Sequence, residues 1–194
     1  GGMAFYIEGG ASSNIATELS SLVGSSGSGN KLNITMNSGS NLIRWNAPTG
    51  GSINLSSISS LSSSIANVTV TGSNYNTLSI NKGELVIDEN VALTGTGNAY
   101  NGVEMSQSKV TLASGYNITG ALDGQIGIAQ INPGTLSDVS ITNNGTITLS
   151  GKKSTGLALD HGYITNTGTI EVTNPGITGE GSLGIFSAND TVTV

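Results

Sequence analysis

Apolar residues recur along most of the chain in short alternating runs, separated by Gly, Asn, Asp and Ser. In one stretch Leu78 and Ile80 flank Ser79, and Leu85 and Ile87 stand two positions apart in the same way a few residues later. Such alternation is typical of a β-strand with one buried face, and the residues between the runs favour tight turns. The pattern predicts many short strands, because a helix would bring its apolar residues back every 3.6 positions.

The runs repeat with a period near 25 residues, and residues 72–96 align without a gap with residues 97–121. A first series of equivalent apolar positions is Leu78, Val103, Ile128, Leu157 and Ile185. A second series is Leu85, Val110, Val139, Ile164 and Val192. A third series is Val70, Leu93, Ile118, Leu149 and Val172. Repetition at this scale indicates a stacked architecture in which each unit packs mainly on its neighbours.

Three strands in about 25 residues fit one turn of a parallel β-helix, whereas a propeller blade takes about 40 residues. Each strand would lie parallel to its equivalent one turn later, about 4.8 Å away. We take the coil as right-handed, because parallel crossovers nearly always are. The predicted fold is an all-β, right-handed, single-stranded parallel β-helix with three short strands per coil.

Two nearly identical nonapeptides leave the register of these strands open. Residues 141–149 read ITNNGTITL and residues 164–172 read ITNTGTIEV, 23 positions apart. The second series instead places Val139 under Ile164, 25 positions apart. A slip of two residues keeps every side chain on its own face, so both registers are compatible with the sequence. Asparagines turned inward at equivalent corners could form stabilising amide ladders.

The N-terminal quarter departs from the pattern. Residues 12–23 carry Ile15, Leu19 and Leu22 on one helical stripe, which predicts a short helix. We therefore divide the chain into an irregular or capping region, residues 1–52, and β-helix coils, residues 53–194. The last four residues read as a strand of an interrupted coil, which leads us to expect a fragment truncated at the C-terminus of the stack.

The amino-acid composition narrows the range of possible functions. Charged residues make up 9% of the chain, and the net charge of −6 includes only six Lys and Arg. No basic face can be assembled from so few cations, which argues against a nucleic-acid partner. The absence of cysteine excludes disulfides and thiolate metal sites. No apolar run approaches the roughly 18 to 20 residues of a membrane span.

The segments ITNNGTITLSGKKSTGLAL (141–159) and GYITNTGTIEV (162–172) resemble repeats in passenger domains of bacterial type V autotransporters, especially very large adhesins of Gram-negative anaerobes. The resemblance extends over residues 72–194. It implies a right-handed β-helix displayed outside the cell, at the bacterial surface, by a C-terminal membrane barrel beyond this chain. It also implies adhesion to a host-cell or bacterial surface protein or glycan. We expect a monomer, and the motif carries no functional residue across.

Catalytic chemistry is not predicted. His161 follows Asp160, but adjacent turn residues are expected to point in different directions, so His161 is interpreted as an exposed corner residue. In a 25-residue register Asp88 lies beside Ala113 and Glu104 lies beside Ala129. The acids therefore do not form the paired carboxylates of a glycosidase, and we predict no catalytic residue, cofactor or metal.

Two alternatives remain. The first is a polysaccharide-degrading or glycan-binding β-helix protein of the lyase or tailspike type, which would need acids clustered on one face. The second is an ice-binding solenoid, which needs a flat Thr-x-Thr ladder on every coil. Thr146 and Thr148 fit such a ladder, but Asn117 at the equivalent position of the preceding coil breaks it.

Binding is expected on irregular segments carried by the rigid coil, namely residues 12–30, 40–50 and 129–138. The last is favoured because the gap between first and second strands grows from 7 to 11 residues there. The candidate partner-binding residues are Tyr75, Tyr100, Gln130, Asn132 and Asp138. Tyr75 and Tyr100 are one period apart and could stack into an aromatic platform. Glu84 and Lys109 also stack, which predicts an ion pair worth roughly 0.2–1 kcal/mol.

Overall fold

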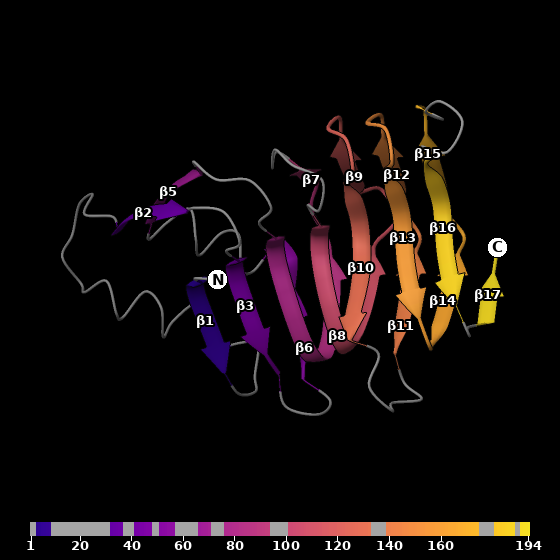
Figure 1. Ribbon diagram of the computed structural model, residues 1–194. Coiled ribbons are helices and arrows are strands. Elements are labelled where there is room, and N and C mark those ends of the chain that lie inside the picture. The colour runs from indigo at the N-terminus through magenta and orange to yellow at the C-terminus, as the bar shows by residue number, and fades with distance from the viewer. Residues whose placement is uncertain are drawn as a thin grey trace.

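The computed structural model describes residues 3–8, 32–36, 41–47, 51–56, 66–70, 76–93, 101–132, 139–174, 181–188 and 191–194. In this part of the chain almost all of the structure is parallel β-sheet, wound into a solenoid (Figure 1). The predicted fold class is thereby confirmed, while the hand of the coil stays a prediction. The predicted helix over residues 12–23 lies outside the described residues.

The first face of the solenoid is a row of parallel strands stacked in chain order. They are β1 (Met3–Glu8), β3 (Asn41–Asn46), β6 (Asn76–Ile87), β8 (Asn101–Leu112), β10 (Ile126–Asn132), β13 (Thr155–Asp160) and β16 (Leu183–Ala188). The register pairs Leu78 with Val103, Val103 with Ile128, Ile128 with Leu157 and Leu157 with Ile185. The first apolar series predicted from the sequence is therefore confirmed along its whole length.

The second face continues from the first around a corner. It contains β4 (Ser52–Asn54), the second halves of β6 and β8, β11 (Ser140–Asn143), β14 (Tyr163–Asn166) and β17 (Thr191–Thr193). Strands β6 and β8 run through this corner without a break, and the backbone turns at Lys82 (φ 59°) and Gln107 (φ 52°). We call this turn the first corner. It joins both faces into one 11-stranded sheet.

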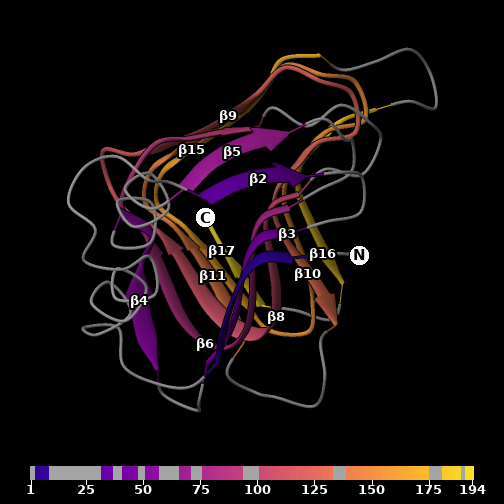
Figure 2. The same cartoon turned by 90° about the vertical axis from the view of Figure 1, so that its left-hand side faces the viewer.

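The third face is a separate four-stranded sheet. It consists of β7 (Val91–Leu93), β9 (Asn117–Gly120), β12 (Thr146–Leu149) and β15 (Thr169–Val172). Figure 2 looks at the stack from its β1 end, with β9 and β15 along one side and β6, β8 and β11 along another. A two-stranded parallel sheet pairs β2 (Leu32–Met36) with β5 (Ala66–Val70). Among the described residues, no helix is long and apolar enough to cross a membrane.

The core is a set of apolar columns that run through the stack. Inward side chains of all three faces meet there, and Met105, Leu112, Ile118 and Ile147 are completely buried. Each fully buried aliphatic side chain contributes roughly 1.5–3 kcal/mol. Since inward positions within the stack are covered by the rungs above and below, the stability of each coil depends on its neighbours.

The second and third apolar series were partly wrong. Ile141, not Val139, pairs with Ile164, so the nonapeptide register of 23 residues holds. On the third face Ile118 pairs with Val91 and Ile147, whereas the series had matched it with Leu93 and Leu149. Both errors are slips of two residues, which preserve the buried face and are therefore invisible to apolar periodicity.

A column of glycines lies at the start of the first-face strands. A Cβ added to Gly127 would come within 2.6 Å of the Gly156 carbonyl oxygen. A Cβ added to Gly156 would come within 2.6 Å of the Gly184 carbonyl oxygen and of Ile170 Cγ2. The backbone of one rung therefore approaches the next so closely that only glycine fits. The sequence held this signal, because these glycines immediately precede Ile128, Leu157 and Ile185 of the first series.

Candidate functional site

The sequence-predicted binding residues divide into two groups. Tyr75, Tyr100 and Asp138 lie outside the described residues, so the aromatic stack and the 129–138 site stay predictions. Asn132 ends strand β10. Gln130 lies in the same strand and pairs in register with the fully buried Met105.

Gln130 serves the packing of the first corner. Its Oε1 accepts a hydrogen bond of 3.2 Å from the backbone N–H of Asp160, one rung further along the stack. Its Nε2 is buried and has no hydrogen-bond partner. Because Gln130 shares the column of Met105, its amide holds two rungs together at the place where the chain leaves β10.

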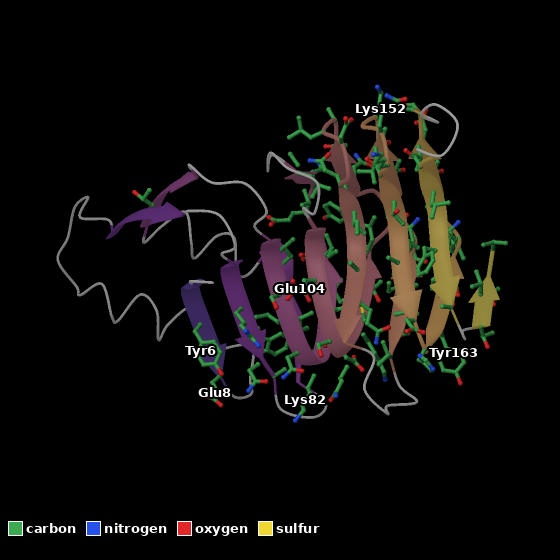
Figure 3. The ribbon with its side chains drawn as sticks, viewed as in Figure 1. Tyr6, Glu8, Lys82, Glu104, Lys152 and Tyr163 are labelled. Carbon is green, nitrogen blue, oxygen red and sulfur yellow. The ribbon has the colours of Figure 1, made fainter. Side chains whose placement is uncertain are left out.

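The first corner carries a row of polar residues in the left-handed backbone region. Lys82, Gln107 and His161 have φ values of 59°, 52° and 65° and occupy equivalent turns. Figure 3 shows Lys82 and Tyr163 along the same edge of the stack, with Lys152 at the opposite edge. His161 is thus an exposed corner residue, as predicted.

The expected separation of Asp160 and His161 is wrong, however. Asp160 Oδ1 lies 2.7 Å from His161 Nδ1, because the left-handed turn at His161 folds the ring back onto the preceding carboxylate. The two side chains are 45% and 56% exposed. Within the described part of the chain, no hydrogen bond joins this imidazole to a Ser or Thr hydroxyl. Among the described residues, therefore, no Ser or Thr completes a nucleophilic triad with this pair.

The carboxylates act singly as braces between rungs. Asp88 accepts hydrogen bonds from the Ser56 N–H (2.8 Å), the Ser56 hydroxyl (2.7 Å) and Asn54 Nδ2 (3.0 Å). Partial burial acts to raise the pKa of Asp88, but these donors together outweigh it, and the pKa lies below its usual value. The charged form of Asp88 is thus tied to the preceding rung.

Other acids behave in the same way. Glu104 lies beside Ala129, as predicted, and its Oε1 accepts a hydrogen bond from the Ser79 hydroxyl (3.1 Å). Asp123 Oδ1 accepts one from the Lys152 N–H (2.8 Å). No group of three or more His, Asp or Glu that could hold a metal ion occurs among the described residues.

The predicted ion pair between Glu84 and Lys109 is confirmed. The two residues pair in register on β6 and β8, and Lys109 Nζ lies 3.3 Å from Glu84 Oε1. Both side chains are about half exposed. This pair is the last charged pair on the outer side of the second face before a stretch that is free of charge.

Beyond Lys109 the outer side of the second face presents hydroxyl groups. In register, Lys109 is followed by Ser140, Tyr163 and Thr191, and Thr111 is followed by Thr142, Thr165 and Thr193. We call the part over β11, β14 and β17 the hydroxyl face. Its residues are Ser140, Thr142, Tyr163, Thr165, Thr191 and Thr193.

Tyr163 dominates the hydroxyl face. Its side chain is 51% exposed, although it stands in a strand that is paired on both sides. The next inward residue, Ile164, is buried and fixes the strand against the core. Sequence reasoning missed this surface because the second series placed Val139 under Ile164. The nonapeptide register, which aligns Thr142 with Thr165, was the signal that could have found it.

Comparison of the chain with protein-family models, curated proteins and solved structures finds no match.

Proposed function

We propose that the chain is a structural and adhesive module of an extracellular autotransporter passenger. Its task would be to hold binding surfaces away from a bacterial cell and to contact a host-cell or bacterial partner. The observation that carries this proposal is the continuous row of parallel strands on the first face, from β1 to β16. The resemblance of residues 141–172 to passenger repeats supports the family.

A rod of this kind binds a partner through outward side chains that are held in fixed positions. Parallel hydrogen bonds and buried columns fix the positions of outward side chains, so a partner meets a preorganised surface and little ordering entropy is lost on contact. Three of the acids, Asp88, Glu104 and Asp123, accept hydrogen bonds from neighbouring rungs. That arrangement favours holding a partner over transforming one.

The proposal can be tested with beads coated with the purified chain. We expect them to adhere to cultured host cells or to bacterial cells more than beads coated with an unrelated protein of similar net charge. Equal adhesion of the two bead types to every surface tried would contradict the adhesive function.

The polysaccharide-degrading alternative draws its support from the contact between Asp160 and His161. It predicts release of new reducing ends from a polysaccharide incubated with the chain. That release would have to disappear in the variant His161→Ala. Our proposal predicts no release from any polysaccharide that the chain binds.

A further inference from the structure

We propose that the hydroxyl face binds a neutral, linear, β-linked glycan, with the ring of Tyr163 as its stacking platform. This inference rests on the proposed adhesive function and names the chemistry of the partner and its place.

Charge comes first. Strands β11, β14 and β17 contain no Asp, Glu, Lys or Arg. On the same face Glu84 and Lys109 pair with each other, and at the first corner before β14 Asp160 contacts His161. A charged partner would gain nothing here and would lose hydration. The hydroxyl groups of a neutral partner, by contrast, can form hydrogen bonds with the hydroxyl groups of Ser140, Thr142 and Thr165 in place of water.

The backbone gives a second constraint. Strand β14 is paired with β11 on one side and with β17 on the other. Its N–H and C=O groups are therefore used within the sheet, and an extended peptide cannot add to it by strand pairing. A partner lying on this face meets side chains alone.

The spacing of those side chains suits a sugar chain. The hydroxyl columns run across the strands, along the axis of the stack, with one step of about 4.8 Å per rung. An extended peptide advances about 3.3–3.4 Å per residue and would fall out of step with the rungs. The pyranose units of an extended β-1,4-linked glycan advance by a length close to one rung and alternate in orientation, so every second sugar presents the same groups to the hydroxyl columns.

Tyr163 supplies the apolar contact. Sugars have an apolar face of C–H groups, and an exposed tyrosine offers a rigid ring with a polar tip. Asp160 and His161, three and two residues before Tyr163 in the chain, contact each other at the first corner.

The test uses cello-oligosaccharides and chito-oligosaccharides of increasing length, titrated into the purified chain by calorimetry. We expect binding that strengthens with length until the glycan spans the three rungs. Tyr163→Ala should weaken it about 3- to 10-fold, and Tyr163→Phe should largely preserve it. Phe186→Ala is the matched control, because Phe186 on β16 is equally exposed (49%) but lies on the first face. Circular dichroism would establish that each variant is folded.

Three outcomes would overturn the inference. The first is no binding of either oligosaccharide series, and the second is equal weakening by Tyr163→Ala and Phe186→Ala. The third is capture of a protein instead, with loss of that capture in Tyr163→Ala. If coated beads still adhere to cells after any of these, only the glycan assignment fails. If the beads do not adhere, the adhesive function fails with it.

Discussion

Asn143 and Asn166 are joined across neighbouring rungs by a hydrogen bond of 2.7 Å, in which Asn143 Nδ2 donates to Asn166 Oδ1. Asn143 is completely buried, and its own Oδ1 accepts a hydrogen bond from the Gly145 N–H. This contact confirms the expected amide ladder for these two rungs. It also fixes the turn between the second and third faces.

Asn143→Ala should lower the free energy of unfolding by about 1–3 kcal/mol, because the Gly145 N–H and the Asn166 amide would lose a buried partner. Urea denaturation measures the change. Asn144→Ala is the control, since the Asn144 Oδ1 accepts only an exposed hydrogen bond from Thr167 and its loss should cost about 0.5 kcal/mol. Equal destabilisation by both variants would contradict the role of the ladder.

The glycine column gives a second prediction. Gly156→Ala should destabilise the fold by about 1–3 kcal/mol, since the new methyl group would overlap the Gly184 carbonyl and Ile170. Gly184→Ala should be far milder, because its nearest neighbour would be Ile170 Cγ2 at an ordinary 3.8 Å. The difference in thermal midpoint between the two variants is the measurement. A similar midpoint for both would show that the rungs can move apart freely.

Asp88 should make stability depend on pH in the acid range. Its pKa is lower in the folded chain than in the unfolded chain, where it is about 3.9. The stabilisation from its ionised form is therefore complete above the unfolded pKa and disappears as the pH falls through the folded pKa. The unfolding free energy of the wild type minus that of Asp88→Asn should shrink on acidification.

Urea titrations at several pH values would measure this difference. Ser56→Ala removes one of the three donors, so the pH dependence should become weaker in that variant. A constant difference between wild type and Asp88→Asn, down to strongly acid pH, would rule out the stabilising role of the carboxylate.

The pair of Glu84 and Lys109 should contribute little. A double-mutant cycle with Glu84→Gln and Lys109→Met should give a coupling energy of roughly 0.2–1 kcal/mol, because both side chains are about half exposed. The coupling should fall further at high salt, where charges are screened over a few ångströms. A large coupling that salt does not change would mean that the pair is shielded from solvent.

The sequence was sufficient for the fold class and for the first face. The series from Leu78 to Ile185 was predicted in the correct register, because each of its members is apolar and separated by nearly constant intervals. The stacked pair of Glu84 and Lys109 followed from the same 25-residue register. Periodicity is a reliable guide where rungs have equal length.

The predicted register failed on parts of the second and third faces. At Gly120, which pairs with Leu93 and Leu149, the interior is filled by the buried amide of Gln125. That amide accepts a hydrogen bond from the Leu122 N–H and donates one to the Leu93 carbonyl. A polar residue in an apolar column leaves no trace in hydrophobic periodicity. The hydroxyl face was missed for the related reason that hydrogen bonds between asparagines, rather than apolar spacing, set its register.

The unequal lengths of the rungs indicate where the chain could accept an inserted peptide. Val110 pairs with Ile141, 31 positions further on, and Ile141 pairs with Ile164 only 23 positions further on, yet the three lie in one uninterrupted sheet. Strand β10 ends at Asn132, and Val139 directly precedes strand β11, which begins at Ser140. A foreign peptide grafted between those two residues would leave both neighbouring registers unchanged. The stack could therefore serve as a carrier for epitopes, which would be inserted between Asn132 and Val139.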